Sequence, residues 1–386
     1  MTAVPARAEL SQWIEINRNS LLHNLAEFRR LAGPRKKIMA VVKANAYGHG
    51  ILPTARIVSA NGADWLGVHS VEEGCVLREA GIGIPILVLG YVPLVSLEEA
   101  LLRDLSLVVY NPQTIGQLVR ASRRLQKKAR VHVKLETGTH RQGVAEKDVL
   151  SFIETIRGHG EIVLEGLSSH FANIEDTTKH DYPRLQIGIF RRVLDKLRSR
   201  GIRIPLTHMS CTAAAILFPR THYDMVRIGI GLYGLWPSKE TYLARLMQKK
   251  DVLALRPVLS WKARIAQIKD VPVDSLVGYG CTFKTTRRTR LAVVPAGYYD
   301  GYSRSLSNAS HVLVRGRRAP VRGRVAMDFL TADVTDIRGA RLEDPVTLIG
   351  RDGREHVGAD DLAALTGTIN YEIVSRINPQ IPRFVV

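Results

Sequence analysis

The sequence predicts an α/β protein in which a (β/α)8 TIM barrel is followed by a mostly antiparallel β domain. Three observations support this fold class: the length of 386 residues, an alternation of short apolar runs with helical stretches over the first 230 residues, and a change to β-runs and turns after about residue 253. We place the barrel at 17–245. The β domain takes 246–386, joined by the N-terminal strand in 1–16.

Eight β-rich apolar runs in the first part of the chain match the strands of such a barrel. They are Ile38–Val42, Trp65–Val68, Ile86–Leu89, Leu107–Tyr110, Val131–Leu135, Ile162–Leu167, Ile204–His208 and Tyr223–Ile228. Eight strand-then-helix units over roughly 200 residues are typical of a (β/α)8 barrel. A doubly wound open sheet also alternates, but it commonly has fewer strands, and its GxGxxG fingerprint is missing after the first run.

Helix signals separate the runs, and one further run precedes them. We expect the first helix to begin at a Ser20 cap and to end before Gly33. Three later helices have clear signals: Val71–Ala80 after a Ser70 cap, Asn111–Pro112 through Leu125, and Arg184–Ser199 before Gly201. The run Trp13–Ile16 would make a ninth barrel strand, so we assign it to the β domain.

The second part of the chain has few helix signals and six β-runs separated by turns. The runs are Val258–Gln267, Arg290–Val294, His311–Arg315, Ala319–Val325, Leu330–Val334 and Pro345–Ile349. This rhythm favours a separate, mostly antiparallel β domain.

The composition excludes several classes of protein. With 45% hydrophobic and 24% charged residues, the chain can bury a sizeable core and is not disordered overall. Apolar runs such as Ile84–Leu89 stop well short of the roughly 18 residues that a membrane span needs, so we expect a soluble protein without membrane contact. Cys75, Cys211 and Cys281 are too few for a disulfide framework, and the N-terminus lacks an apolar signal stretch. A reducing cytoplasm is the simplest location.

The net charge of +19 raises the question of a nucleic-acid partner. The basic residues occur in short groups scattered along the chain, such as Arg35–Lys37, Arg123–Arg124 and Arg287–Arg288, without a nucleic-acid-binding motif. We therefore interpret them as solvated faces. An anionic substrate or cofactor could also use part of this field.

The strand ends carry the residues that suggest chemistry, because barrel enzymes keep their active site at the carboxyl ends of the strands. Lys43 follows the first run directly, and a partly desolvated lysine there could form a Schiff base with an aldehyde. The alternative is a structural lysine whose stem packs on apolar surface. Lys134, His170, His208 and Arg227 stand at other strand ends, and Arg141 follows Lys134.

So many cations at one mouth would repel one another unless an anion neutralised them, which implies a phosphate-bearing ligand. Gly229, Gly231 and Gly234 follow the eighth run, where barrels often hold phosphate on backbone N–H groups. A metal site is not expected, because no Asp, Glu and His grouping has ligand spacing, and no GxSxG elbow suggests a serine triad.

The segments AVVKANAYGHG, KLETGTHRQG, EGLSSHFAN, MVRIGIGLYG, GYGCTF, PAGYYDGYSR, GRVAMDF and INYEIVSRI resemble, in order, the signature segments of the alanine racemase family. The first segment is shared with other fold-type III pyridoxal 5'-phosphate (PLP) proteins, but the full set is specific. The resemblance covers nearly the whole chain. It implies a barrel joined to a β domain, PLP as cofactor, alanine as substrate and a head-to-tail homodimer with shared active sites.

The resemblance also implies the catalytic residues. Lys43 would hold PLP and act as one acid/base group, and Tyr279 of the partner subunit would act as the second from the opposite face, as inversion requires. Arg227 would face the pyridine nitrogen of the cofactor. Because arginine donates only, this favours racemisation over a PLP decarboxylase, which would be expected to place a carboxylate there.

Further matched residues bind the cofactor or the substrate in that family. His170 would pack on the cofactor, and Tyr47, Thr212, Gly229, Ile230 and Tyr371 would hold the phosphate. Thr212 stands where serine is usual, but the hydroxyl is kept. Arg141 and Met327 would bind the substrate carboxylate, and Lys134 matches a lysine that the family carries in carbamylated form.

Departures from the family pattern concern the entrance to the site. His140 replaces a glycine, Ala326 a cysteine and Tyr299 a small residue. They leave a broad-specificity amino-acid racemase, or a PLP decarboxylase on the same fold, as alternatives to an alanine racemase that supplies D-alanine for peptidoglycan.

Overall fold

The computed structural model describes residues 7–249, 251 and 253–386. Residues 1–6 lie outside the described part. Much of the N-terminal stretch in which we expected no apolar signal segment therefore lies outside it too. The chain divides into two compact units. One, the barrel unit, contains Leu21–Ala46 and Ile51–Arg256; the other, the β unit, contains the described chain up to Ser20, Tyr47–Gly50 and Pro257–Val386.

Eight parallel strands form the barrel unit, in the spatial order β8-β7-β6-β5-β4-β3-β2-β9. Their bounds are β2 Lys37–Val41, β3 Trp65–Val68, β4 Ile86–Val88, β5 Ser106–Val109, β6 Ala129–Lys134, β7 Ile162–Ser168, β8 Leu206–His208 and β9 Met225–Ile228. The first of these strands, β2, pairs with the last, β9. Between β8 and β9 the backbone makes single hydrogen bonds, one of them from Asp224 N–H to the Thr207 carbonyl at 3.0 Å. The sheet is thus a nearly closed barrel, which confirms the predicted fold class.

Each of the eight predicted runs overlaps one barrel strand, and the main differences are two-residue shifts at three strand starts, one of which is β6, which begins at Ala129 instead of Val131. The run predicted from Tyr223 becomes a strand only at Met225, because Tyr223 has a left-handed backbone (φ 44°) that no strand accommodates. The run predicted from Ile204 begins at Leu206. The core between the strands includes Met39, Trp65, Leu87, Val108 and Met225.

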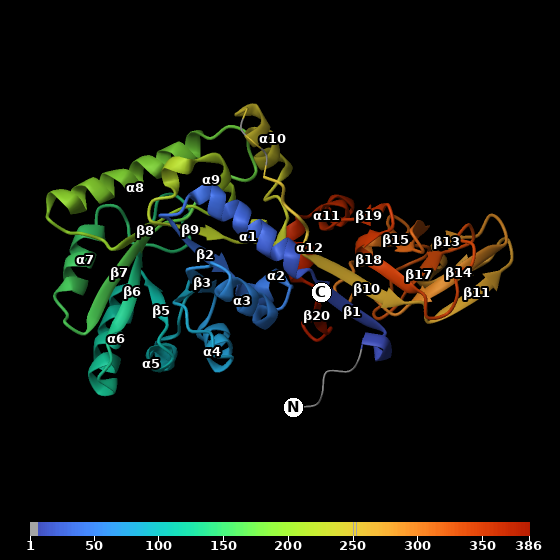
Figure 1. Cartoon of the computed structure of the whole chain (residues 1–386), viewed down its shortest axis with the longest axis horizontal. Coiled ribbons are helices and arrows are strands. Elements are labelled where there is room, and N and C mark those ends of the chain that lie inside the picture. Colours follow the sequence, from blue (N-terminus) through green and yellow to red (C-terminus); the bar gives the residue numbers. More distant parts are fainter. Residues whose placement is uncertain (1–6, 250, 252) are drawn as a thin grey trace. The chain divides into compact units, whose positions relative to one another are not determined.

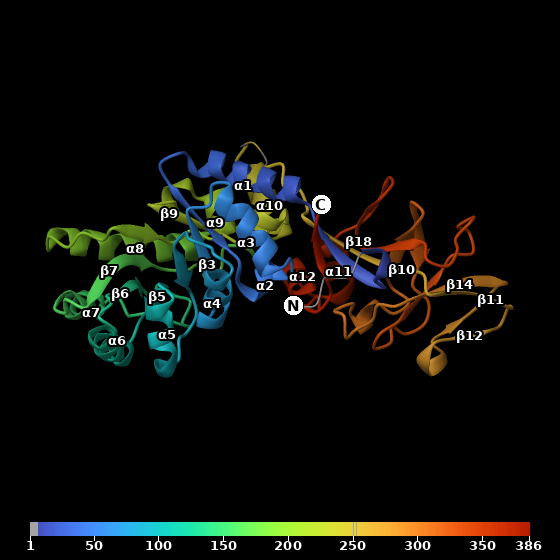
Figure 2. The same ribbon diagram turned by 60° about the horizontal axis from the view of Figure 1, so that its bottom comes forward.

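Helices lie around the outside of these strands, as Figures 1 and 2 show for α3 to α8. Their bounds are α1 Arg18–Ala32, α2 Lys43–Tyr47, α3 Ile51–Ala60, α4 Val71–Glu79, α5 Leu97–Leu102, α6 Pro112–Leu125, α7 Val149–Arg157, α8 Asp181–Ser199, α9 Thr212–Leu217 and α10 Lys239–Met247. No described helix is both long and apolar enough to span a bilayer.

The predicted caps of α4 and α6 are confirmed. The Ser70 side chain accepts a hydrogen bond from the Glu73 N–H, and the Asn111 side chain accepts one from Thr114 N–H at 2.8 Å. The predicted end of the first helix before Gly33 is confirmed, but its predicted start was wrong: α1 begins at Arg18, and Asn17 Oδ1 accepts from the Ser20 N–H. Helix α8 likewise begins at Asp181, three residues before the predicted Arg184.

The β unit contains three sheets, and all but one of its strand pairs are antiparallel. A larger sheet has the order β16-β15-β18-β10-β1-β20, with β19 beside β18; the others are β11-β14-β17 and β12-β13. The bounds are β1 Gln12–Ile16, β10 Leu259–Arg264, β11 Gln267–Val271, β12 Leu276–Val277, β13 Phe283–Lys284, β14 Thr289–Val294, β15 His311–Val314, β16 Arg317–Pro320, β17 Leu330–Asp333, β18 Pro345–Asp352, β19 Glu355–Val357 and β20 Arg383–Val385, with helices α11 Ala359–Thr366 and α12 Asn370–Ser375. Strand β1 pairs antiparallel with β10 and parallel with β20.

Two predicted runs of the β domain differ from the structure. The run Val258–Gln267 is not one strand but contains β10 and the start of β11, which belong to different sheets. The run Ala319–Val325 supplies only the end of β16, which stops at Pro320. Proline cannot donate to a ladder, and only an isolated bridge from Val321 to Ala332 follows.

Candidate active site

The carboxyl ends of the barrel strands bring together five of the residues that the sequence singled out. Lys43 follows β2, Lys134 ends β6, His170 follows β7, and His208 and Arg227 lie at β8 and in β9. All five belong to the barrel unit. The predicted convergence on one mouth is therefore what the fold produces.

Lys43 begins a turn that the sequence did not predict. Ala44, Asn45 and Ala46 all have left-handed backbones, with φ values of 53°, 53° and 54°. Non-glycine residues adopt this conformation at a cost, and such strain gathers at functional sites. Glu73 stabilises the turn, because one carboxylate oxygen accepts from the Ala44 N–H at 2.7 Å and the other from the His69 N–H at 2.6 Å.

The amine of Lys43 is half-buried, and its pKa lies below the ordinary lysine value. Desolvation is the main cause, the positive charge of Arg141 adds to it, and Glu73 opposes both. A lysine amine with a lowered pKa is a better nucleophile near neutral pH. The structure thus favours the reactive interpretation of Lys43 over the purely structural one.

The pKa of Lys134 is lowered more strongly than that of Lys43. Desolvation, followed by the charges of Arg227 and Arg141, lowers the pKa of its amine to about 7. Near neutral pH this amine is therefore partly uncharged, which relieves some of the repulsion that the sequence predicted for this mouth.

Arg227 is only 7% exposed and is held at five points. Its Nη2 donates to the Ser169 carbonyl at 2.8 Å, to the Met209 carbonyl at 3.1 Å and to His170 Nδ1 at 3.2 Å. Its Nη1 donates to His208, to Nδ1 at 2.8 Å and to the carbonyl at 3.1 Å. Desolvation lowers the pKa of Arg227 to about 10, so the guanidinium stays charged at neutral pH.

The two histidines beside Arg227 are uncharged at neutral pH. Desolvation, together with the nearby charges of Arg227 and Lys134, holds the pKa of both His170 and His208 well below the ordinary histidine value. Because arginine can only donate, Nδ1 of each ring must be the acceptor. The sequence had grouped these histidines with the cations, whereas the structure makes them acceptors for Arg227.

The segment expected to hold phosphate lies at the end of β9. Ile230 opens a short 3-10 helix, Ile230–Tyr233, and the Gly229 N–H donates to Thr212 Oγ1 at 3.1 Å. Gly231 is required by packing, because a Cβ there would approach Phe28 Cζ to 2.5 Å and Thr212 Cγ2 to 2.6 Å. Thr212 and Gly229, predicted to share one ligand group, are thus already neighbours.

Arg141 lies in a loop organised by Glu136. Glu136 Oε1 accepts from the Gly138 N–H at 2.5 Å and from the Thr139 N–H at 2.6 Å. Burial pushes the pKa of Glu136 upward, but these backbone donors outweigh it and hold the pKa below its ordinary value. His140, which stands in place of the usual glycine, has a left-handed φ of 52°. The loop therefore keeps a glycine-like conformation without a glycine.

The remaining predicted residues belong to the β unit. Tyr279 is 74% exposed and lies in the turn between β12 and β13, flanked by Gly278 (φ 74°) and Gly280 (φ 70°). Met327 is 53% exposed. The rings of Tyr47 and Tyr371 lie near one another, with centroids 6.1 Å apart.

The sequence did not single out His132 on β6 and Glu165 on β7, although His132 contacts His208. His132 lies two residues before Lys134 on β6, and successive alternate residues of a strand face the same way. That spacing was the available signal. Glu165 gave none, because it projects from an irregularity in the sheet.

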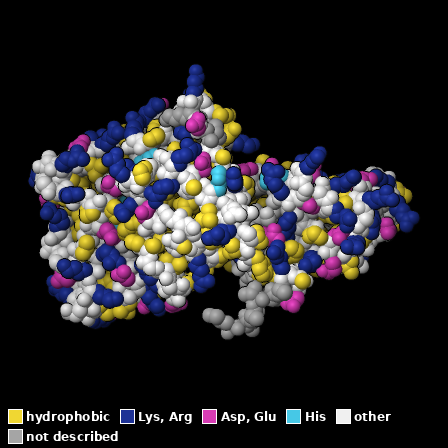
Figure 3. Space-filling model, viewed as in Figure 1, with side chains coloured by type: hydrophobic (Ala, Val, Ile, Leu, Met, Phe, Trp, Pro, Cys, Tyr) yellow, Lys and Arg dark blue, Asp and Glu magenta, His cyan; other side chains and the backbone are white. Residues whose placement is uncertain are grey.

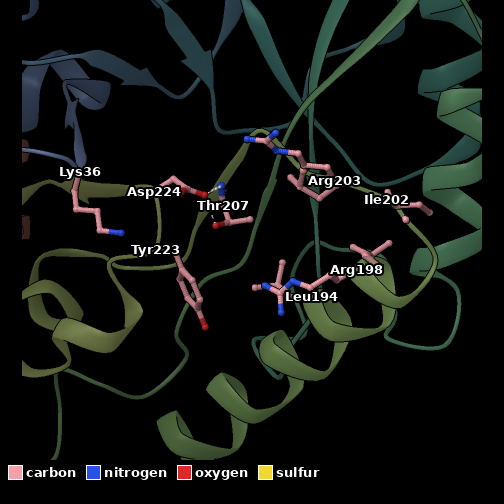
Figure 4. Close-up of a pocket in the computed structure, with 11 residues that line it drawn as sticks. Lys36, Leu194, Arg198, Ile202, Arg203, Thr207, Tyr223 and Asp224 are labelled. Atoms are coloured by element: carbon pink, nitrogen blue, oxygen red, sulfur yellow. Dashed lines mark hydrogen bonds between the residues drawn. The ribbon is translucent and has the colours of Figure 1, made fainter.

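A cavity of about 670 Å³ lies at the amino ends of the barrel strands. Figure 4 shows the side chains that line it, among them Lys36, Arg203, Tyr223 and Asp224, which precede their strands, and Thr207, the second residue of β8. Both Thr207 donors bond to Asp224 Oδ2, so this carboxylate anchors the backbone. None of the predicted site residues lines this cavity.

The fold and the cluster of basic residues at the carboxyl ends of its strands define a barrel enzyme of the α/β class, in which the pKa of Lys43 is lowered. Two family models match the chain: "Alanine racemase, N-terminal domain" over residues 16–237 and "Alanine racemase, C-terminal domain" over residues 258–385. The chain belongs to the alanine racemase family, and it is an isomerase of that family.

Individual relatives agree with this assignment. Alanine racemases of Halothermothrix orenii and Leptospira interrogans are 43% and 40% identical, over 96% and 97% of this chain and 96% of each relative. Among solved structures, alanine racemase of Clostridium difficile 630 has a TM-score of 0.91 at 33% identity, covering 98% of this chain and 96% of that one. Alanine racemase of Bacillus anthracis with bound L-Ala-P has a TM-score of 0.91 at 32% identity, covering 99% and 96%.

Proposed function

We propose that the protein is a PLP-dependent alanine racemase that interconverts L-alanine and D-alanine. The observation that carries the proposal is the state of Lys43, which follows β2 at the carboxyl ends of the strands, is half-buried, and has an amine pKa lowered by desolvation and by the charge of Arg141. When bound, PLP withdraws electrons from the α-carbon of an amino acid and makes its α-proton removable.

The residues present fit this cofactor. An aldehyde needs an amine that is uncharged part of the time, and desolvation prepares Lys43 for that state. An anionic phosphate group would offset the charges of Lys43, Lys134, Arg141 and Arg227. The Thr212 hydroxyl accepts from the Gly229 N–H at 3.1 Å and keeps its own hydrogen to donate, so it would hold the phosphate together with Gly229, Ile230, Tyr47 and Tyr371.

Two acid/base groups would invert the α-carbon. Lys43 would remove or return the proton on one face, and Tyr279 of the partner subunit would do so on the other. The high exposure of Tyr279 supports this role, because a phenol that serves another subunit must project from its own. Arg141 and the backbone of Met327 would hold the substrate carboxylate.

Arg227 supports racemisation over decarboxylation. Its five hydrogen bonds use Nη1 and Nη2 and fix the charged guanidinium, so its Nε–H would be the donor for a ring nitrogen, whereas a carboxylate there would accept a proton from that nitrogen. Arg227 would therefore disfavour protonation of a cofactor ring nitrogen placed next to it, which would limit electron withdrawal by the ring and suppress side reactions. His170 would pack on the cofactor while it accepts from Arg227.

A carbamylated Lys134 would complete the charge balance. Carbamylation needs an uncharged amine, and a pKa of about 7 supplies one near neutral pH. The product carries a negative charge, which would hold Arg141 in place.

A homodimer with shared sites would use the exposed apolar and aromatic surface of the β unit. Its members Leu276, Tyr279, Tyr298, Tyr299, Met327 and Phe329 are 42% to 74% exposed. Backbone hydrogen bonds join two of the loops that carry them, from the Tyr298 N–H to Ala326 and from the Tyr299 N–H to Met327. An exposed surface of this kind is typical of an interface.

We place the enzyme in the cytoplasm, where it would supply D-alanine for peptidoglycan. A nucleic-acid partner is not part of the proposal; Figure 3 shows Lys and Arg side chains spread over the visible face rather than gathered in one patch.

Proton exchange in deuterated water tests the proposal. With added PLP, L-alanine should exchange its α-proton and yield D-alanine without release of carbon dioxide. Exchange with serine and other amino acids at similar rates would establish the broad-specificity alternative. Carbon dioxide release would establish the decarboxylase, and no exchange of any amino acid would refute the proposal.

A further inference from the structure

A continuous line of side chains runs from Arg227 across the barrel interior to a carboxylate on β7. Arg227 Nη1 lies 2.8 Å from His208 Nδ1, and His208 Nε2 lies 2.9 Å from His132 Nδ1. His132 Nε2 then lies 3.2 Å from Glu165 Oε2. Ser106 Oγ donates to the same oxygen at 2.6 Å. We call Arg227, His208, His132 and Glu165 the relay.

The donors and acceptors of the relay can be assigned without ambiguity. Arg227 only donates, so His208 Nδ1 accepts and His208 Nε2 carries the hydrogen. His132 Nδ1 must then accept, which leaves the hydrogen of His132 on Nε2, facing Glu165. Every bond therefore points the same way, from Arg227 to the carboxylate.

A charged His132 would break this order. With hydrogens on both nitrogens, His132 would force His208 Nε2 to accept, and the remaining His208 hydrogen would then face the Arg227 donor. Two donors 2.8 Å apart repel each other. The charge of Arg227 at one end and the carboxylate of Glu165 at the other thus select one arrangement.

Three features of the barrel accommodate the side chains of the relay. The β6–β7 register shifts between Val131 and His132, whose partners are Leu164 and Gly166, so Glu165 is the extra residue. At Gly166 a Cβ would lie 2.2 Å from His132 Nδ1, so only glycine leaves room for the ring. The His132 ring also meets Trp65 edge to face, with centroids 5.5 Å apart.

Burial and nearby charges favour the same protonation states of His208 and Glu165 as the hydrogen bonds do. His132 and His208 are fully buried, and desolvation with the charge of Arg227 holds the pKa of His208 well below its ordinary value. Burial raises the pKa of Glu165, but the hydrogen bonds from His132 and Ser106 outweigh it, so its pKa lies below the ordinary value. The lowered pKa values of His208 and Glu165 thus agree with the order of donors and acceptors that the geometry gives.

We propose that Glu165 and His132 are positioning residues: through His208 they present an acceptor to Arg227 and so fix the guanidinium that faces the cofactor ring. The consequence for racemisation rests on the proposed function. The relay itself belongs to the protein and exists with or without cofactor.

Nitrogen NMR of the histidine rings, recorded on ¹⁵N-histidine-labelled protein without PLP, tests the relay. In the wild-type protein at neutral pH, His132 and His208 should both be uncharged, with hydrogen on Nε2 and a bare Nδ1. Either ring with its hydrogen on Nδ1, or with both nitrogens protonated, would overturn the proposal. This measurement needs no variant and no activity.

Variants test whether Glu165 sets the hydrogen positions on the two histidine rings. Glu165→Gln keeps an oxygen acceptor and should keep both ring states, whereas Glu165→Leu should shift the His132 signals toward a mixture of the two neutral forms. The matched control is Glu161→Gln, which changes a partly buried carboxylate that pairs with Arg123 just before β7. If the rings of Glu165→Leu matched those of the wild type, Glu165 would not set them.

Kinetics separates positioning from folding. If the proposed function holds, Glu165→Leu should lower kcat on the order of 10-fold, the size typical of a second layer of hydrogen bonds, with little change in KM, and Glu165→Gln should restore most of the loss. An unchanged kcat together with altered ring signals would refute the positioning role. An inactive wild type with the predicted ring states would refute the proposed function and leave the relay standing.

Discussion

The two ends of the barrel carry similar basic residues in different surroundings. At the carboxyl end, Lys43, Lys134 and Arg227 are desolvated, and their pKa values are lowered. At the amino end, Lys36 and Arg203 line an open cavity, and the Asp224 carboxylate binds the backbone and side chain of Thr207. Lowered pKa values of basic groups, rather than hollow volume, therefore mark the active end.

The largest difference between the two ends should follow from replacing their lysines. Lys43→Ala should lower alanine racemisation by at least the order of 10² to 10⁴ that a positioned acid/base group contributes, because it also removes the attachment point of the cofactor. Racemisation rates at saturating PLP measure the effect.

The same substitution at the amino end, Lys36→Ala, is the matched control and should leave the rate unchanged. Equal losses in the two variants would mean that the comparison between the ends has no functional content.

The next effect concerns the residue expected from the partner subunit. Tyr279→Phe should lower racemisation on the order of 10² to 10⁴ while stability stays unchanged, because the side chain is 74% exposed. The loss should appear in kcat for both directions of the reaction.

Mixing Lys43→Ala chains with Tyr279→Phe chains should restore activity, since one site of each heterodimer then has both groups. A mixture no more active than either parent would contradict sharing between subunits.

A smaller effect concerns stability. The pKa of Lys134 is about 7 in the folded protein against about 10.4 in an unfolded chain. Between these values the unfolded chain binds more protons, so the free energy of unfolding of the cofactor-free protein should rise with pH from about 7 to 10. Urea unfolding at several pH values measures this slope, and Lys134→Met should reduce it. A slope identical in both proteins would show that Lys134 is not desolvated.

The smallest effect belongs again to the amino end. Arg203→Ala changes an exposed guanidinium, so the free energy of unfolding should change by less than about 0.5 kcal/mol, with racemisation unaltered. Thermal unfolding measures it. A large loss of activity would place function in the cavity shown in Figure 4.

The sequence predicted the barrel strands and which residues stand at their carboxyl ends, because both depend on local pattern. Apolar runs specify buried strands, and the topology of a (β/α)8 barrel then brings their ends together. Lys43 and Arg227 could be singled out before any coordinates were known, since each lies at or directly after a run.

What could not be predicted depends on contacts distant in sequence. The neutrality of His170 and His208 follows from burial beside Arg227, and the place of Glu165 follows from a shift of register. The left-handed turn after Lys43 contains two alanines, which no rule of turn composition marks. The split of the run Val258–Gln267 between two sheets also required the tertiary structure.

The most direct test compares the two lysines of the carboxyl end, Lys43 and Lys134. The protein is incubated with PLP, reduced with borohydride and digested, and the pyridoxyl group is located by mass spectrometry. The account predicts the label on Lys43 and none on Lys134, although Lys134 has a pKa of about 7. A label on Lys134, on another lysine or on no residue would contradict the account.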